Sequence, residues 1–597
     1  MSNSSSQQNS PKSTAAPSRR AVLQALFAIS KGWTKPGSGG KGSGGRSGAN
    51  DGSGPGPNAG ANIGAGKRGL APLPKPGRAG AGPGPKTGPE DDPERGSDAS
   101  QEARQDSEAD AGENLGSGLA SPQSPFFAGL DGRDRALAER LYRGVLQNLR
   151  VIDLLLERGA ELDPKRTREA IKWVLRLAVY QHVFLDSVPP HALVHQSVEL
   201  GREFGGNRAG GYVNAMLRRL LPVLPEAAEG LPRVLTKLLG RPATPAEHYS
   251  VPDKVAKMLE EGYGKAAMSG LLRSFNDPAP RVWLRGNSLK GNVDELRQRL
   301  MAEGVDTTSE DGVPSALRLV VGGGAPWTTD CWDRGELTVQ DVGAMLATHL
   351  LMPPQAARES GKGSDERSAK RFPKRFAKRF AKPSDKGPIE EQGNWPDEAV
   401  LDRCAAPGGK TGHLWEAMGG RGRLTAVEQN PERRKILEDA MERLYGKGHA
   451  IEVLSPREMM SSNNALRTGG KFKAILLDSP CLGFGLLGRH PEARWDGRAE
   501  SISRVAGTQR AILEDGARFL APGGRLLWVT CSPTLLEVED IVTPFLEAHS
   551  DFRLVDLGDR TPNWARPWVQ IDEGILRTRP DLAAVDAFAY AMLEKSR

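Results

Sequence analysis

The chain has 597 residues, of which 81 are Lys or Arg and 74 are Asp or Glu, so its net charge is +7 and its pI is about 9.1. This length allows several compact domains, and the small positive excess suits an anionic partner only if the charge is concentrated in one region. Four cysteines without short pair spacings argue against a disulfide framework and a structural zinc site, and no apolar stretch of about 18 residues occurs, so we predict a cytoplasmic protein with no metal and no membrane partner.

The N-terminal part of the chain is predicted to contain one helix between two disordered stretches. Residues 1–17 are interpreted as a disordered tail, and the apolar residues of 20–31 recur at helical spacing. Gln24 interrupts this apolar run and no small-residue cleavage site follows it, so we do not expect a targeting segment. Residues 34–123 are rich in Gly, Ser and Pro and bury too little apolar surface to offset the entropy of ordering, which predicts a disordered insertion.

Helical periodicity returns after this insertion. Apolar residues three and four apart predict helices in DGRDRALAERLYRGVLQNLRVIDLLLER, TREAIKWVLRLAVYQHVFL, PHALVHQSVELGREFG and AGGYVNAMLRRLLPVL. Together with the helix at 20–31, they predict an all-α domain over residues 18–225, interrupted at 34–123. The last of these helices contains Arg218 and Arg219, which are interpreted as solvent-exposed residues of an ordinary amphipathic helix.

Residues 226–330 are predicted to form connecting helices and a small α+β module. The stretches PRVWLRGNSL, DELRQRLMAEGV and ALRLVVGGG indicate a strand, a helix and a strand. Arg281, Arg285 and Lys290 stand near Trp283, a combination that suits contact with RNA but equally suits a solvated face. The pattern leaves both interpretations open.

Strands and helices alternate from residue 331 to residue 597, and this alternation predicts an α/β domain with a doubly wound, mainly parallel, Rossmann-like sheet. Ligands of such sheets bind beyond the carboxyl ends of the strands. A basic insertion, residues 354–396, repeats the unit KRF every four residues. Basic and aromatic side chains in this pattern can neutralise phosphates and stack on bases, and a solvated low-complexity loop remains the alternative.

A glycine-rich loop, CAAPGGKTG, lies between a predicted strand and a predicted helix of this domain. Gly408 and Gly409 allow the backbone to approach a ligand closely, and the helix N-terminus behind them carries partial positive charge. The next strand ends at Glu428, where a carboxylate can accept hydrogen bonds from both hydroxyls of a ribose. The chain lacks the spacing of a phosphate loop and of a dinucleotide fingerprint, so we predict another cofactor that contains adenosine.

Two cysteines follow predicted strands of the same sheet. Asp478 and Cys481 lie in DSPC at the end of one strand, and Cys531 lies in VTCSP at the end of another. Thiols at the carboxyl ends of two strands of one sheet can face one pocket, which favours a catalytic role over packing. His490 has no partner at metal-ligand spacing and is interpreted as a loop-ordering or RNA-contacting residue.

Five motifs, CAAPGGKT, DSPCLGFG, RHPEARW, VQD and TCS, resemble those of the Sun (Fmu) family of S-adenosylmethionine-dependent RNA 5-cytosine methyltransferases. The helical N-terminal part, with YVNAMLRRL, resembles a NusB-like RNA-binding domain found in that family. The resemblance implies S-adenosylmethionine as cofactor and RNA rather than DNA as partner. The substrate is expected to be small-subunit ribosomal RNA, with tRNA as the alternative, and the enzyme is expected to be a monomer.

The resemblance also implies roles for individual residues. In the RNA family the cysteine of TC attacks the base and the cysteine of PC assists product release, which implies these roles for Cys531 and Cys481. Asp478 is placed to hold ring nitrogen 3 of the cytosine. The implied cofactor-binding residues are Cys404, Ala405, Ala406, Pro407, Gly408, Gly409, Lys410, Glu428 and Asp478.

One departure from the family motivates a rival interpretation. Relatives carry an acidic residue after the strand that AIEVL matches, where this chain has Ser455 and Pro456. The rival is an RNA-binding or ribosome-assembly protein whose catalysis has decayed. The presence of both Cys481 and Cys531 argues against it.

Overall fold

The structure is a computed structural model that describes residues 17–33, 125–127, 129–185, 188–225, 227–277, 281–309, 312–352, 398–461, 472–496 and 499–597. The two predicted insertions, 34–123 and 354–396, lie outside these residues, as does the predicted tail 1–17 except for Pro17, which begins the first helix. Among the helices of the described ranges, none is both long enough and apolar enough to cross a membrane.

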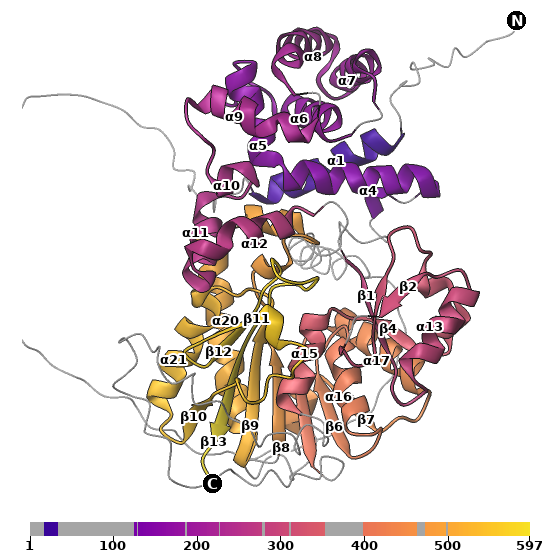
Figure 1. Ribbon diagram of the computed structural model, residues 1–597, viewed down its shortest axis with the longest axis vertical. Coiled ribbons are helices and arrows are strands. Elements are labelled where there is room, and N and C mark those ends of the chain that lie inside the picture. The colour runs from indigo at the N-terminus through magenta and orange to yellow at the C-terminus, as the bar shows by residue number, and fades with distance from the viewer. Residues whose placement is uncertain are drawn as a thin grey trace, which may run out of the picture. The chain divides into compact units, whose positions relative to one another are not determined.

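The N-terminal helices share one apolar core, as the periodicity predicts. Val22 and Leu26 of the first helix are buried together with Tyr142 and Trp173, which confirms that the helix predicted at 20–31 packs with the later ones. Asp131 begins the second helix, because its side chain accepts a hydrogen bond from the Asp134 N–H. The helices of this domain (Figure 1) are α1 (Pro17–Trp33), α4 (Gly132–Gln147), α5 (Leu149–Leu154), α6 (Glu169–Phe184), α7 (Pro190–Gly205), α8 (Asn207–Leu220) and α9 (Leu231–Leu239).

Three connecting helices pack against the C-terminal domain. These are α10 (Pro245–His248), α11 (Asp253–Tyr263) and α12 (Met268–Phe275). Their apolar faces form a core with Phe484 and Leu487, two residues of the segment that follows Cys481. The connecting helices therefore support one of the two cysteine-bearing loops.

A small antiparallel sheet follows, with the strand order β2-β3-β1-β4. Its elements are β1 (Trp283–Gly286), α13 (Val293–Ala302), β2 (Thr307–Ser309), β3 (Ala316–Leu319), α14 (Asp330–Asp333) and β4 (Leu337–Val339). The predicted strand, helix and strand are confirmed as β1, α13 and β3. The predicted domain boundary between 330 and 331 cuts through this sheet, because β4 pairs with β1.

Neither interpretation of Arg285 is correct. Its side chain is buried rather than solvated or free to contact RNA. The guanidinium Nε donates to Gln340 Oε1 at 2.6 Å, and a terminal nitrogen of the same group forms an ion pair with Glu416 of the C-terminal domain. Trp283 is buried as well, and its indole N–H donates to the Ala584 carbonyl at 2.6 Å. All four residues of β1 are buried. The contacts of Arg285 and Trp283 therefore hold the small sheet against the C-terminal domain.

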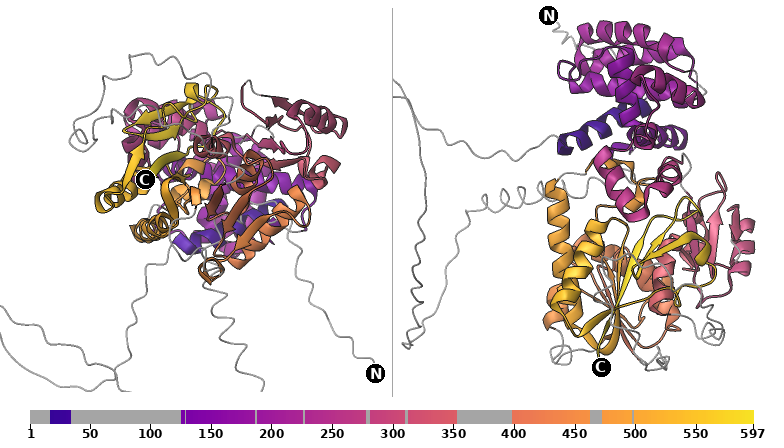
Figure 2. Two further views of the ribbon diagram at one scale, coloured as in Figure 1. Left: turned by 90° about the horizontal axis from the view of Figure 1, so that it is seen from below. Right: turned by 60° about the vertical axis from the view of Figure 1, so that its left-hand side comes forward.

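The C-terminal domain contains a nine-stranded sheet (Figure 2) in which β7, β6, β5, β8 and β9 are parallel, as predicted. The strands β10 to β13 were not predicted to be antiparallel: β13 pairs antiparallel with β9, β10 and β12, and β12 pairs antiparallel with β11. The strands are β5 (Ala399–Arg403), β6 (Arg423–Val427), β7 (Ile451–Leu454), β8 (Phe472–Asp478), β9 (Leu520–Thr530), β10 (Phe552–Val555), β11 (Val569–Asp572), β12 (Ile575–Thr578) and β13 (Ala589–Lys595).

Helices cover both faces of this sheet, so the domain is doubly wound as predicted. One face packs on α15 (Val342–Leu351), α16 (Gly409–Ala417) and α17 (Pro431–Tyr445). The opposite face packs on α18 (Pro456–Ser461), α20 (Ala499–Arg518) and α21 (Glu539–Ala548). The strands β8 and β9 contribute buried apolar residues to both faces, which is why their apolar runs were a reliable signal.

The segment RHPEARW joins the helical domain and the connecting helices to the C-terminal domain. Arg494 is fully buried and donates to the Gln147 carbonyl at 2.8 Å and to Asn276 Oδ1 at 3.0 Å. Trp495 donates its indole N–H to the Leu146 carbonyl at 3.0 Å. His490 contacts Glu492 of the same segment, as expected for a residue that orders the loop, and no group of three potential metal ligands occurs in the described residues.

Candidate active site

The predicted site residues lie at the carboxyl ends of four adjacent parallel strands. Cys404 follows β5, Glu428 follows β6, Asp478 is the last residue of β8 and Cys531 follows β9. Parallel strands end at the same edge of a sheet, so this topology gathers the four residues along one edge.

The glycine-rich loop makes a tight turn into α16. Cys404 and Gly408 have positive φ angles of 63° and 105°, and Gly408 is the N-cap residue of the helix. A Cβ at Gly408 would come within 2.9 Å of the side chains of Leu437 and Met441, so the turn and the packing both favour glycine there. Burial raises the pKa of the Cys404 thiol to about 12.

Glu428 is fixed against this loop. Its Oε2 accepts a hydrogen bond from the Ala406 N–H at 3.3 Å, and its Oε1 accepts one from the Asn430 N–H at 3.0 Å. Each carboxylate oxygen has a further lone pair, so the side chain can still accept hydrogen bonds from a ribose. The loop and the carboxylate therefore fit the predicted adenosine-containing cofactor.

The two predicted catalytic thiols are in direct contact. The sulfur atoms of Cys481 and Cys531 lie 2.6 Å apart, and both residues are half-buried free cysteines. The hydrogen bond with Cys481, together with burial, raises the pKa of the Cys531 thiol well above its usual value, whereas the positive charge of Lys410 acts to lower it. Burial and the neighbouring thiol therefore favour the protonated form of Cys531, and Lys410 is the cation that favours its thiolate.

Lys410 and Asp478 form an ion pair beside the thiols. The Lys410 ammonium donates to Asp478 Oδ2 at 2.7 Å and lies 5.4 Å from the centre of the Phe588 ring. Burial alone would lower the pKa of Lys410, but the charge and hydrogen bond of Asp478 outweigh it and hold the pKa above its usual value. The raised pKa keeps the Lys410 ammonium charged beside the Asp478 carboxylate.

A cluster of one arginine and two aspartates lies near the site. Arg489 donates to Asp586 Oδ2 at 2.7 Å and to Asp341 Oδ2 at 3.0 Å, and all three residues line a small hollow. Burial and the neighbouring Asp341 raise the pKa of Asp586 to about 7, while Arg489 acts to lower it. Asp341 belongs to VQD and Arg489 to RHPEARW, so the structure brings two of the recognised motifs together.

Ser455, the residue at the predicted departure from the family pattern, serves as a helix cap. Its hydroxyl accepts a hydrogen bond from the Glu458 N–H at 3.2 Å, and Glu458 Oε2 accepts one from the Ser455 N–H at 2.7 Å. This reciprocal pair is a capping box at the start of α18. The departure from the family pattern therefore has a structural role in this chain.

Asp402 is a site residue that sequence reasoning missed, although a charged residue inside an apolar strand is a signal. It is fully buried in β5, and its Oδ2 accepts a hydrogen bond from the Thr411 hydroxyl at 2.6 Å. Its Oδ1 has no hydrogen-bond partner among the described residues. Burial raises the pKa of Asp402 to about 7, against the hydrogen bond from Thr411.

This raised pKa predicts a dependence of stability on pH. In the folded protein Asp402 keeps its proton up to about pH 7, whereas in the unfolded chain it loses the proton near pH 4, so the folded state binds the extra proton between these values. Its contribution to the free energy of unfolding is therefore expected to fall as the pH rises from about 4 to about 7. The Asp402→Asn variant should show a smaller decrease in Tm over this range. If Tm fell equally in the wild-type protein and in the Asp402→Asn variant between pH 4 and pH 7, the raised pKa of Asp402 would be contradicted.

Gly485 is expected to be intolerant of a side chain. A Cβ there would lie 1.8 Å from the Ala587 carbonyl oxygen and 2.5 Å from that of Cys531, and backbone cannot move away cheaply. Because the Gly485 N–H donates to the Cys531 carbonyl at 2.7 Å, Gly485→Ala should separate the two cysteine loops and lower kcat about 100-fold. Gly507→Ala in α20 meets no atom within 4 Å and is the matched control. Equal kcat values for the two variants would refute the prediction.

Comparisons with known proteins agree with this architecture. Residues 393–594 match the family model for 16S rRNA methyltransferase RsmB/F, residues 100–222 match the NusB family, and residues 251–323 match the ferredoxin-like domain of RsmF/B-like methyltransferases.

Curated relatives match most of the chain. The chain is 27% identical to the probable ribosomal RNA small subunit methyltransferase B of Bacillus subtilis, covering 78% of this chain and 92% of that protein. It is 28% identical to the ribosomal RNA small subunit methyltransferase B of Vibrio cholerae, covering 78% and 90%. The crystal structure of PH0851 has the same fold, with a TM-score of 0.57 and 24% identity over 82% of this chain and 94% of that one. The chain is therefore similar to the RsmB/F methyltransferases over residues 393–594, and regions similar to the NusB family and to the ferredoxin-like domain of these enzymes precede that part.

Proposed function

We propose that the protein transfers a methyl group from S-adenosylmethionine to carbon 5 of a cytidine in RNA, and that the RNA is small-subunit ribosomal RNA. The observation that carries the proposal is the contact between the thiols of Cys481 and Cys531, 2.6 Å apart, at the ends of neighbouring strands. The curated relatives are named as methyltransferases of that RNA, which supports the choice of substrate.

The chemistry explains why a thiol is needed. Carbon 5 of cytosine is a poor nucleophile. The Cys531 sulfur therefore gives up its proton and bonds to carbon 6, ring nitrogen 3 takes up a proton, and the electrons of the former ring double bond make carbon 5 nucleophilic. Asp478, which accepts a hydrogen bond from the Lys410 ammonium, holds ring nitrogen 3 and stabilises the charge that develops there. The methyl donor supplies an electrophilic methyl group to carbon 5.

The product is released by elimination. A base removes the proton from carbon 5, the electrons of that bond restore the ring double bond, and the bond between carbon 6 and Cys531 breaks, returning its electrons to sulfur. Cys481, which touches Cys531, assists this departure. The cytidine must leave its stack to reach the thiols, as the substrates of other base-modifying enzymes do.

The cofactor would be held by the residues that the turn and β6 place together. The backbone from Cys404 to Gly409 offers close approach, and Glu428 would accept hydrogen bonds from the ribose hydroxyls. Lys410 and Asp478 lie between this loop and the thiols.

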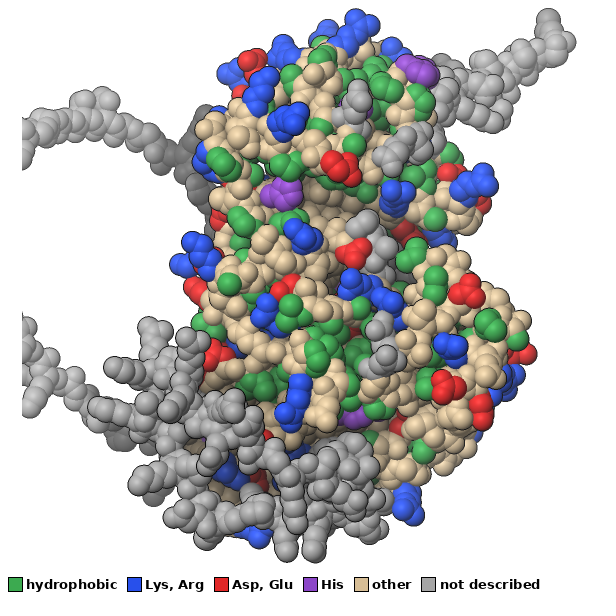
Figure 3. All heavy atoms as spheres, in the orientation of Figure 1, with side chains coloured by type: hydrophobic (Ala, Val, Ile, Leu, Met, Phe, Trp, Pro, Cys, Tyr) green, Lys and Arg blue, Asp and Glu red, His purple; other side chains and the backbone are tan. Residues whose placement is uncertain are grey.

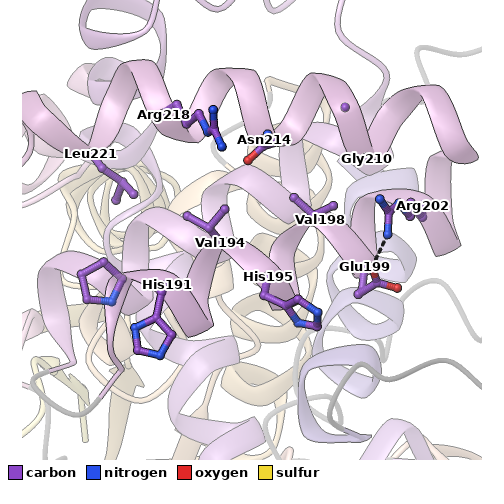
Figure 4. A pocket seen from close by; sticks show the side chains of 12 residues that line it. His191, Val194, His195, Val198, Glu199, Arg202, Gly210, Asn214, Arg218 and Leu221 are labelled. Atoms are coloured by element: carbon purple, nitrogen blue, oxygen red, sulfur yellow. Dashed lines mark hydrogen bonds and ion pairs between the residues drawn. The ribbon is translucent and has the colours of Figure 1, made fainter.

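The helical domain offers a surface for RNA. A hollow of about 620 Å³ lies between α7 and α8 (Figure 4), and Lys and Arg side chains gather over this end of the molecule (Figure 3). Arg218 lines the hollow and makes no hydrogen bond or ion pair within the described residues. Gly211 also lines it, and a Cβ there would meet nothing within 4 Å, so the helix backbone is open to a ligand. Cationic side chains beside accessible backbone suit a phosphate chain.

Charge reversal at Arg218 tests this surface. Arg218→Glu should weaken RNA binding several-fold and reduce the slope of log affinity against log salt by about one, because one phosphate contact is lost. Arg219→Glu is the matched control, because Arg219 is the adjacent arginine but its side chain bonds to Ala160 and Glu161 outside the hollow. Fluorescence anisotropy with a labelled ribosomal RNA fragment measures both values. Equal affinities for the two variants would exclude the hollow as an RNA contact.

The proposed activity is tested by incubating the protein with labelled S-adenosylmethionine and either small-subunit ribosomal RNA or tRNA. Label at carbon 5 of a ribosomal RNA cytidine supports the proposal, and mapping of bisulfite-resistant cytidines identifies the nucleotide. Label in tRNA alone would change the substrate. Binding of RNA without transfer to any RNA would favour the RNA-binding or assembly protein instead.

A further inference from the structure

We propose that Glu537 is a positioning residue for the thiol pair: its carboxylate ties the loop around Cys481 to the turn that follows Cys531, and so sets the distance between the two sulfur atoms. The chemical role of the two thiols is taken from the proposed function. The way in which Glu537 holds them is argued only from the contacts in the structure. Glu537 lies in a short helical turn, η12 (Leu535–Glu537), that follows β9 and the TCS motif.

The carboxylate of Glu537 reaches the Cys481 loop. Its Oε2 accepts hydrogen bonds from the Leu482 N–H at 3.0 Å and from the Gln509 side-chain amide at 3.1 Å. The same Gln509 amide donates to the Pro480 carbonyl at 3.0 Å. The residues on both sides of Cys481 are thus held directly or through one fully buried glutamine.

The backbone of Glu537 is fixed to the Cys531 side. Its carbonyl accepts a hydrogen bond from the indole N–H of Trp528, a buried residue of β9, at 3.2 Å. Its N–H donates to the Thr534 carbonyl at 3.3 Å, which closes the turn. One residue therefore connects the end of β9 to the loop that carries the other thiol.

The burial of Glu537 is otherwise hard to explain. Its side chain is 2% exposed, and no cation forms an ion pair with it in the described part of the chain. Its Oε1 has no hydrogen-bond partner among the described residues. Burial raises the pKa of Glu537 to about 7, while Ser532 and the Leu482 N–H act to lower it. A buried acid without a counter-ion destabilises the fold, so an apolar residue would serve packing better.

Backbone hydrogen bonds also connect the two cysteine-bearing segments: the Gly485 N–H donates to the Cys531 carbonyl, and the Ser479 N–H donates to the Val529 carbonyl. The Glu537 connection is adjacent to Cys481, whereas Gly485 lies further along the loop. Without an acceptor at Glu537, the Leu482 N–H and the Gln509 amide lose their partner and Cys481 is no longer held beside Cys531.

Two variants separate hydrogen bonding from charge. Glu537→Leu keeps approximate size but removes both acceptor oxygens. Glu537→Gln keeps one acceptor, which can take both bonds from Leu482 and Gln509, and its amide nitrogen can donate to the neighbouring Ser532 hydroxyl. Glu594→Gln is the control, because Glu594 is also buried but pairs with Arg553 on the outer strands.

The thiol spacing is measured without RNA or cofactor by the binding of phenylarsine oxide, which needs two adjacent thiols. Wild-type protein should bind it and Cys481→Ser should not. Glu537→Leu should bind it at least tenfold more weakly, while Glu537→Gln and Glu594→Gln should resemble wild type. In the transfer assay, Glu537→Leu should lose about 100-fold in kcat with an unchanged KM for S-adenosylmethionine, and Glu537→Gln should restore most of it. A thermal unfolding curve for each variant confirms that the variant is folded before its thiol binding and kcat are compared with those of the wild type.

Two results would overturn the inference. One is wild-type binding of phenylarsine oxide by folded Glu537→Leu. The other is loss of kcat in Glu537→Gln with thiol binding intact, which would make Glu537 a proton-transfer group instead. Failure of the proposed function is distinguishable, because wild-type protein would then transfer no methyl to RNA while the dependence of thiol binding on Glu537 persisted.

Discussion

Cys531→Ala is expected to abolish methyl transfer, with a loss of at least about 10⁴-fold in kcat, because no other nucleophile can form the bond to carbon 6 of the cytosine. Binding of RNA and cofactor should persist, since the side chain removed is small and half-buried. The measurement is transfer of labelled methyl to RNA, together with gel analysis for a covalent complex of protein and RNA. Neither product nor complex should form.

Cys481→Ala should differ from Cys531→Ala in the same two assays. Cys531 can still attack, so a covalent complex should form, but release is slowed and the complex should accumulate. Cys331→Ala is the control, because Cys331 is buried in the small antiparallel module. An active Cys531→Ala protein beside an inactive Cys481→Ala protein would reverse the two roles. A covalent complex in Cys531→Ala would show that a different group attacks the base.

The sequence predicted the parts of the site that depend on local pattern. Apolar runs followed by helices identified the parallel strands β5, β6, β8 and β9, and parallel strands must end at one edge. The predicted residues at their ends, from Cys404 to Cys531, therefore came together. The glycine-rich turn could also be predicted from the sequence, because the positive φ angle of Gly408 depends on that residue alone and favours glycine.

The remaining features depend on contacts between distant parts of the chain. Arg285 is basic and stands in a polar stretch, but its partner Glu416 lies 131 positions away, so its burial had no local signal. The antiparallel pairing of β13 with β9 depends on the tertiary packing of the C-terminal strands. Glu537 was overlooked for a similar reason, because an acid among apolar residues looks like a surface position until Leu482 and Gln509 are placed against it.

The ion pair of Lys410 and Asp478 should behave as one unit. Lys410→Met leaves the Asp478 carboxylate without its cation, and Asp478→Asn leaves the ammonium without its anion, in a site where the two side chains are only 12% and 28% exposed. Each change is expected to lower kcat by about 10²- to 10³-fold, because the proton for ring nitrogen 3 and the charge that favours the Cys531 thiolate are lost together. Each should also lower the free energy of unfolding by about 3 kcal/mol, the scale for breaking a buried pair.

The double variant, Lys410→Met with Asp478→Asn, distinguishes a shared role from two separate ones. If the pair acts as one unit, its kcat should be close to that of either single variant, and it should be more stable to urea than both, because no unpaired charge remains buried. Lys435→Met is the control, since Lys435 is an exposed lysine that pairs with Asp439 on α17. Losses of kcat that multiply in the double variant would mean that Lys410 and Asp478 contribute independently, with Lys410 acting on the thiols and Asp478 on the base.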